Sequence, residues 1–216
     1  AVSRSPAVAE SLTSGRWPDA DWDRFAECTG TERWQYEQST HPHLFLDADT
    51  WVEQTEQHQS DVISAWVSHL RRIAYTPTGG FCVRALNDHT AESGWGVIDI
   101  HGNRRPAFAA LRSACQPVVI TIDALPATTT AGGRVSVAIH VASDLRHDIE
   151  GATVDVDITG SQLFQNQRFV GTIEADASSY IGTITTVAPS EGNIEITATL
   201  TTNYGTSTAK TTSVVA

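Results

Sequence analysis

The C-terminal part of the chain alternates between apolar and polar residues with a period of two. Val and Ile occupy every second position, separated by Thr, Ser, Asp and Glu, in residues 134–141, 153–158 and 193–200. This alternation is typical of half-buried β-strands, and Gly, Pro and Ser residues mark turns between the segments. About seven short strands in roughly 100 residues predict an antiparallel sandwich of immunoglobulin-like type over residues 117–216.

The N-terminal part carries apolar residues at helical spacing. A long helix is predicted over residues 49–74, and its apolar face comprises Val62, Ile63, Trp66, Val67, Leu70 and Ile73 or Ala74. A shorter helix contains Trp22, Phe25 and Ala26, and either Asp19 or Asp21 can cap it. A third helix, residues 106–115, starts with proline in its first turn. Between the long and the last helix, residues 81–86 and 95–100 are predicted to be short strands.

The two parts also differ in composition. All six tryptophans and all three cysteines lie before residue 116, and Thr, Val, Ile and Ala dominate afterwards. A helix seldom continues into the residue before a proline, so we place the boundary at Gln116-Pro117. The predicted fold class is α+β, with a mostly helical domain over residues 1–116 and an all-β sandwich over residues 117–216.

Charge and cysteine content exclude several classes of function. With 14 basic and 25 acidic residues, the formal net charge is −11, which disfavours nucleic acid and anionic membranes as partners. No apolar run approaches the length of a membrane span. The cysteines Cys28, Cys82 and Cys115 match neither a disulfide framework nor a zinc pattern, so free thiols are expected. Because the chain begins with Ala1 and contains no Met, we expect a piece of a longer protein.

Several motifs follow one another in an order that resembles the C-terminal third of glycoside hydrolase family 2 enzymes of the β-mannosidase-like kind. They are residues 16–24 (RWPDADWDR), 70–81 (LRRIAYTPTGGF), 86–88 (LND) and 95–99 (WGVID), followed by a helix and by Pro117 at the start of the sandwich. The resemblance covers residues 1 to about 150. It implies that residues 1–116 are the end of a catalytic (β/α)₈ barrel.

In that family, two glutamates hydrolyse β-linked sugars with retention of configuration. The resemblance places the nucleophile just upstream of Ala1, and Glu10 is a weak substitute because it lacks the preceding strand and the following glycine. We therefore expect no catalytic residue in this chain, and no hydrolysis by the chain alone. About 250 residues are needed to close such a barrel, so the apolar faces of residues 1–116 require an upstream segment or self-association to cover them.

Asn87, Asp88 and Trp95 are the substrate-binding residues that the resemblance implies. Asn87 and Asp88 would lie at the mouth of the barrel, and Trp95 would form a wall of the sugar site. Each residue also has a simpler interpretation, because Asn-Asp is common in turns and a tryptophan often belongs to a core.

The remaining clusters of polar residues have simpler explanations than catalysis. Asp19, Asp21 and Asp23 match the start of a calcium loop, but the glycine and the final glutamate of that loop are missing. The histidines His41, His43, His58 and His69 are interpreted as surface residues, and Glu53, Glu56 and Asp61 as a solvated helix face. Residues 144–148 are interpreted as a charged hairpin connection. No metal or other cofactor is therefore expected.

A non-catalytic role is the alternative hypothesis, with the sandwich binding carbohydrate or packing against a neighbouring domain. The sandwich holds no tryptophan and only four aromatic residues, namely Phe164, Phe169, Tyr180 and Tyr204, which favours packing over sugar binding. Free thiols and the absence of an N-x-Ser/Thr acceptor favour a cytoplasmic location. The expected partners are a β-linked carbohydrate and the missing barrel segment or a second copy of the chain.

Overall fold

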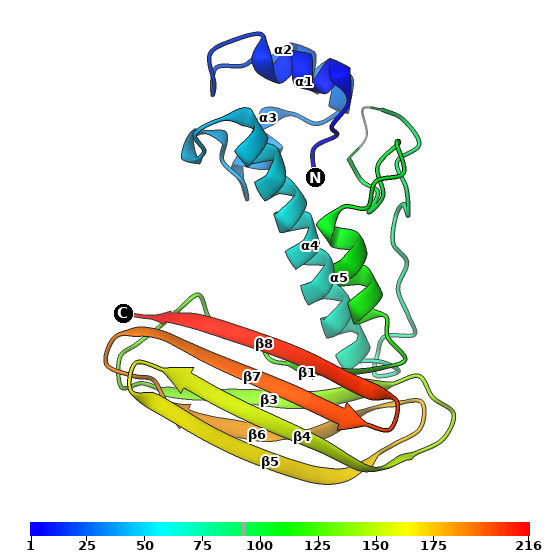
Figure 1. Cartoon of the computed structure of the whole chain (residues 1–216), viewed down its shortest axis with the longest axis vertical. Coiled ribbons are helices and arrows are strands. Elements are labelled where there is room, and N and C mark those ends of the chain that lie inside the picture. Colours follow the sequence, from blue (N-terminus) through cyan, green and yellow to red (C-terminus); the bar gives the residue numbers. More distant parts are fainter. Residues whose placement is uncertain (92–93) are drawn as a thin grey trace. The chain divides into compact units, whose positions relative to one another are not determined.

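A computed structural model describes residues 1–91 and 94–216. The chain forms two compact units, which we call the helical unit (residues 1–67 and 81–114) and the sandwich unit (residues 68–80 and 115–216). The long helix continues from the first unit into the second (Figure 1). None of the helices in the described residues is both long and apolar enough to cross a membrane.

The predicted helices are confirmed. The structure contains α1 (Pro6–Thr13), α2 (Trp22–Thr29), α3 (Arg33–Glu37), the 3₁₀ turn η1 (Pro42–Leu44), α4 (Ala48–Arg72) and α5 (Pro106–Ala114). The Asp21 carboxylate accepts a hydrogen bond from the Arg24 N–H at 3.0 Å, as expected for the residue that caps α2. Ser5 caps α1 in the same way, through the N–H of Val8.

Trp51 is at the centre of the helical unit's core. Its side chain is fully buried, and its indole N–H donates to the carbonyl of Thr40 at 2.7 Å. The rings of Trp17, Trp22, Phe25 and Tyr36 surround it, with centroids between 5.2 and 5.9 Å from that of Trp51. Aromatic burial of this extent explains why short helices can pack stably around the first half of α4.

The predicted strands at residues 81–86 and 95–100 are wrong. Among the described residues of this region, pairing is limited to isolated bridges that join Asn87 to Ile98 and Ile98 to Arg104. Residues 81–86 find no partner strand among the described residues, so their backbone does not form a ladder. Phe81, Val83 and Leu86 are accordingly exposed.

The predicted sandwich is confirmed and is antiparallel apart from one two-residue parallel pair, with eight strands described where about seven were expected. They are β1 (Val118–Ile122), β2 (Thr128–Thr129), β3 (Arg134–Ser143), β4 (Ile149–Gly160), β5 (Leu163–Ile173), β6 (Ala177–Val187), β7 (Gly192–Thr202) and β8 (Gly205–Val215). One sheet has the order β1-β3-β6 and the other β2-β8-β7-β4-β5 (Figure 1). Alternate residues of β3, β4 and β7 face inwards and form the core between the sheets.

Residues 68–80, which include the end of α4, belong to the sandwich unit rather than to the helical unit. The Arg71 side chain is 7% exposed, donates to the carbonyls of Gln116 and Pro117, and forms an ion pair with Asp144 at 2.8 Å. Arg72 forms an ion pair with Asp123. The compact units therefore do not follow the predicted division at residue 116, because these arginines attach the end of α4 to the strands.

The prediction that residues 144–148 form a hairpin connection is also wrong. β3 and β4, which this segment joins, lie in different sheets. The segment therefore crosses from one layer to the other. Its charged residues serve local contacts, such as the Asp148 carboxylate, which accepts a hydrogen bond from the N–H of Ala175 at 2.8 Å.

Candidate functional site

Asp88 lies in the helical unit with its carboxylate turned into the protein. Its side chain is 1% exposed, and one carboxylate oxygen lies 2.8 Å from Nη2 of Arg105. The other oxygen accepts a hydrogen bond from the Gly96 N–H at 2.7 Å. Two separate segments therefore hold the carboxylate in place.

Glu56 from α4 joins the same group of charges. Its Oε1 lies 3.8 Å from Nε of Arg105, and its two oxygens accept hydrogen bonds from Nε and Nη2 of Arg4 at 2.9 and 3.0 Å. Glu56 is buried, whereas the sequence predicted that it lies on a solvated face together with Glu53 and Asp61. The correction has a physical reason: arginines from two distant segments neutralise a carboxylate that could not otherwise leave water.

We call these four residues the buried charge network: Glu56, Asp88 and Arg105 are buried, and Arg4, whose side chain is 45% exposed, ends the network at the surface. Positive and negative groups alternate along it, and the formal charges cancel. A retaining glycosidase needs one carboxylate free to attack and another free to protonate the leaving oxygen. Both carboxylates here are bound to arginines, so the network suits the positioning of the surrounding segments rather than acid–base chemistry.

Gly96 allows two segments of the site to approach closely. A Cβ atom at this position would lie 2.5 Å from the amide nitrogen of Asp88 and 2.6 Å from the carbonyl carbon of Asn87. The same approach is fixed by hydrogen bonds, because the N–H of Asp88 donates to the carbonyl of Ile98 at 2.9 Å. Asn87 directs its amide N–H to the carbonyl of Asp88 at 3.2 Å. The Asn-Asp pair therefore supports the loop that carries Trp95.

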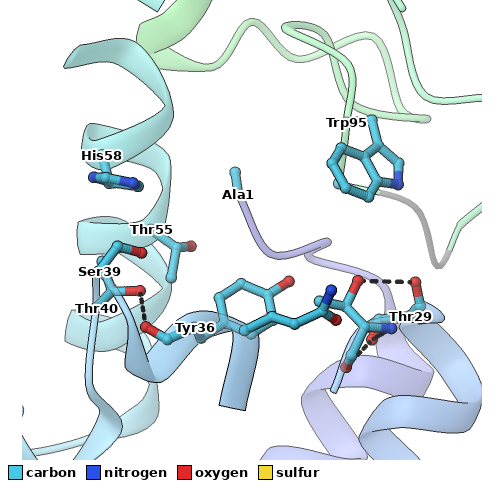
Figure 2. A pocket seen from close by; sticks show the side chains of 11 residues that line it. Ala1, Thr29, Tyr36, Ser39, Thr40, Thr55, His58 and Trp95 are labelled. Carbon is cyan, nitrogen blue, oxygen red and sulfur yellow. Dashed lines mark hydrogen bonds between the residues drawn. The ribbon is translucent and has the colours of Figure 1, made fainter. Parts of the chain in front are cut away.

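Trp95 is the member of the predicted set that reaches solvent. Its side chain is 51% exposed, and the guanidinium carbon of Arg84 lies 4.7 Å from its ring centroid. It lines a pocket of about 190 Å³. In Figure 2, Trp95 and His58 lie at opposite sides of this pocket, with Tyr36 along its floor.

Most of the groups that line the pocket are hydroxyl, amide and aromatic groups that do not ionise in neutral solution. The described lining consists of Ala1, Thr29, Thr31, Gln35, Tyr36, Ser39, Thr40, Thr55, His58, Gly94 and Trp95. Burial raises the pKa of Tyr36 to about 12, so its hydroxyl stays protonated in neutral solution and can donate a hydrogen bond. No carboxylate occurs among these lining residues. The pocket can therefore bind a polar, uncharged molecule against an aromatic ring, but it holds no acid–base pair to cleave one.

The other candidate residues of the sequence analysis lie apart from this site. Glu10 is exposed on α1 and forms an ion pair with Arg24 at 2.7 Å. The rings of His41 and His43 lie near each other, with centroids 5.2 Å apart. Within residues 1–91 and 94–216, no three His, Cys, Asp or Glu side chains are grouped so that they could hold a metal ion. Cys28, Cys82 and Cys115 are free thiols.

Sequence reasoning missed four residues of the site: Glu56, Arg105, Tyr36 and His58. Glu56 follows the buried Val52 by four residues and precedes the buried Ser60 by four, which is a signal that its side chain points inwards. For Arg105, the sequence contains no such signal, because its partners are Asp88 and Glu56 from other segments.

The fold resembles part of known carbohydrate-processing enzymes. A scan of family models and a search of curated proteins find no match. Among solved structures, the chain is similar to the exo-β-D-glucosaminidase CsxA studied with a glucosamine-configured castanospermine, with a TM-score of 0.62 and 15% identity. The alignment covers 81% of this chain and 20% of that one. The exo-chitosanase CsxA of Amycolatopsis orientalis gives a TM-score of 0.61, also with 15% identity and with the same coverage of 81% and 20%.

These similarities establish the fold and its extent. The chain spans about a fifth of the length of the solved enzymes that it matches. Because the alignment covers 81% of this chain, it must include parts of both the helical and the sandwich unit. The chain therefore shares its fold with one region of these larger carbohydrate-processing enzymes.

Proposed function

We propose that this chain is the C-terminal part of a retaining glycoside hydrolase of family 2 type that acts on β-linked sugars. The observation that carries the proposal is the likeness over 81% of the chain to one region of an exo-β-D-glucosaminidase. The order of the motifs at residues 16–24, 70–81, 86–88 and 95–99 supports the same assignment. The helical unit is then the end of a catalytic barrel, and the sandwich is the domain that follows it.

In this proposal, the substrate-binding group consists of Asn87, Asp88 and Trp95, with different tasks. Trp95 offers the exposed face of an indole ring, which suits the apolar face of a pyranose. Asp88, held by Arg105 and Gly96, keeps the loop of Trp95 in position. Asn87 contributes through its backbone bridge to Ile98.

The catalytic glutamates lie outside this chain in our proposal, so the chain alone is inactive. Several large apolar side chains of the helical unit are exposed, which supports the proposal that another segment covers them in the complete enzyme. Val62 is 39%, Val83 37%, Leu86 58% and Ile100 42% exposed. A soluble protein seldom leaves that many large apolar groups in water. The segment that covers them in the complete enzyme is the rest of the barrel.

The sugar itself is the finer part of the proposal. The resemblance in sequence favours β-mannosides or β-galactosides, and the similar solved enzymes are named for glucosamine and chitosan. A net charge of −11 is compatible with a cationic amino sugar polymer. All three sugars therefore belong in the test.

Hydrolysis of chromogenic β-D-mannoside, β-D-galactoside and β-D-glucosaminide tests the proposal. The 216-residue chain is compared with a longer polypeptide in which an upstream segment completes the barrel. We expect no turnover by the short chain and turnover of one glycoside by the longer one. Turnover by the short chain would contradict its inactivity, and a folded longer chain that cleaves none of the three would contradict the glycosidase assignment.

The alternative is a non-catalytic module, in which the sandwich binds carbohydrate or packs against a neighbour. Phe164, Tyr180 and Tyr204 are 73%, 60% and 54% exposed. They lie on β5, on β6 and in the turn between β7 and β8, so they form no single aromatic platform. Their separation favours packing, and saturable binding of an oligosaccharide that survives replacement of Trp95 would favour the module.

A further inference from the structure

β5 is a long strand with one open edge. It is the last strand of the five-stranded sheet and pairs with β4 on one side only (Figure 1). Among the described residues, no other strand pairs with its second edge. Side chains link β5 to the other sheet: the Thr186 hydroxyl donates to Gln165 at 3.1 Å, but the backbone edge stays open. An open edge of this length is a template for another strand.

This edge lacks the features that usually prevent pairing. Natural edge strands carry Pro, Lys, bulges or inward-pointing charges. β5 contains no proline and no lysine, and its register with β4 is regular from Gly171 to Leu163. Its one charged residue is Arg168, whose Nε and Nη2 donate to the two carboxylate oxygens of Asp155 on β4 at 2.5 and 2.9 Å. Phe164 and Val170 are 73% and 68% exposed on the same face.

The sequence of β5 is complementary to itself in an antiparallel arrangement. A two-fold axis through Gln167 pairs each residue with the residue of a second copy that lies equally far from Gln167 in the other direction. Phe164 therefore lies opposite Val170 of the second copy. The same axis places Arg168 opposite Asn166 of the second copy. Phe164 and Val170 therefore each meet an apolar residue, and no two charged residues lie directly opposite each other.

The charges next to this axis are matched within each chain. The Asn166 amide donates to the Asp157 carboxylate at 2.8 Å. The two Arg168 side chains are diagonal neighbours across the axis, and each is bound by Asp155 of its own chain. This ion pairing reduces the repulsion between the two guanidinium groups.

We propose that the β5 edge is an interface for a second copy of this chain, which pairs antiparallel to β5 with the two-fold axis at Gln167. The two five-stranded sheets then form one continuous sheet across the dimer. This inference rests on the sandwich alone and does not depend on the proposed glycosidase activity.

A disulfide that forms only in this register tests the proposal. The variant Gln167→Cys, in a chain whose Cys28, Cys82 and Cys115 are replaced by Ser, places two thiols directly opposite each other at the axis. The matched control is Thr172→Cys on the same strand, whose two copies would lie far apart. Under mild oxidation we expect a covalent dimer with Gln167→Cys, formed at least tenfold faster than with Thr172→Cys. Equal rates would overturn the proposal.

Solution mass distinguishes this interface from association through the helical unit. The parent chain is expected at about twice its monomer mass of 23.3 kDa in sedimentation at micromolar concentration. Val170→Lys should return the chain to monomer, because it places a charge opposite Phe164 at each end of the pairing. Thr208→Lys, on the exposed side of β8, should leave the dimer intact. A dimer that survives Val170→Lys, or a monomeric parent chain, would overturn the proposal.

Discussion

Asp88 and Arg105 form an ion pair of 2.8 Å in which both side chains are almost completely buried, at 1% and 3% exposed. The two residues come from opposite ends of the loop that carries Trp95. Removing charges from water is costly, so such a pair survives only where further hydrogen bonds complete it. Here the N–H of Gly96 and the carbonyl of the same glycine complete it, at 2.7 and 2.6 Å. The loop therefore has a rigid base under a half-exposed tryptophan.

Removal of one partner of this pair should be strongly destabilising. Asp88→Ala leaves the Arg105 guanidinium buried without its carboxylate, a loss that typically costs roughly 3–5 kcal/mol. Urea unfolding followed by tryptophan fluorescence measures this, because all six tryptophans lie in the helical unit. Glu10→Ala removes an exposed ion pair with Arg24 and is the matched control, with little expected change. Equal unfolding midpoints for the two variants would refute the structural role of Asp88.

Gly96 is predicted to tolerate no side chain. In Gly96→Ala the new methyl group would overlap the backbone of Asn87 and Asp88, at 2.6 and 2.5 Å. Backbone atoms cannot move aside without breaking the Asp88 contacts, so we expect a loss of about 3 kcal/mol, near the upper end for forced overlaps. Gly79→Ala introduces the same methyl group into open space. The prediction fails if both variants unfold at the same urea concentration.

Trp95 should contribute to sugar binding if the proposed function is right. Replacement by Ala removes the ring that forms one wall of the pocket. For the monosaccharide that the parent chain binds, we expect between about threefold and tenfold weaker binding. Isothermal titration with mannose, galactose and glucosamine measures this effect. Trp34 is 56% exposed and does not line the pocket, so Trp34→Ala is the control. An unchanged affinity in Trp95→Ala would remove this residue from the substrate-binding group.

Stability of the sandwich unit should fall in acid because of His140. Burial, together with the nearby Arg72, lowers the pKa of His140 below its usual value. The Tyr180 ring packs against it, and Asp123 forms an ion pair with Arg72. The pKa of His140 is lower in the folded chain than in the unfolded chain. At a pH between these two values, the unfolded chain binds more protons than the folded one, so folding stability decreases as the pH falls below about 6.5.

Scanning calorimetry at several pH values tests this assignment. From about pH 7.5 to about pH 5.5, the Tm of the parent chain should fall further than that of His140→Gln, which cannot be protonated in this range. Other groups titrate in both proteins, so the test compares how steeply the Tm of each protein changes with pH. Identical slopes would mean that His140 does not govern the acid sensitivity.

Much of the fold was predictable because its signals are local. The alternation in β3, β4 and β7 depends on which side of a strand faces the core, and this can be read from neighbouring residues. Helix α2 begins after Asp21 for an equally local reason, a side chain that satisfies the first free N–H groups. Residues 81–86 look like a strand by composition, but a strand also needs a partner, and none is present among the described residues.

The candidate site was less predictable. Trp95 could be singled out from its motif, and the structure places it at a pocket. Helical spacing was the one signal for the burial of Glu56, and the sequence held none for Asp88, because a carboxylate leaves water only where a positive group lies close to it in the fold. Those groups are Arg4 and Arg105, and neither is close in sequence to its partner.

By itself, the sequence determined three of the helices and the sandwich of this protein, since each follows from residues near one another in the chain. Only the tertiary structure decided that the end of α4 belongs to the sandwich unit, through Arg71 and Asp144, and that Glu56 is buried. It also decided that no described strand pairs with the second edge of β5. The hydrophobic periodicity of a segment predicts which of its side chains face the core. The charged groups that a side chain contacts depend on segments that come together only when the chain folds.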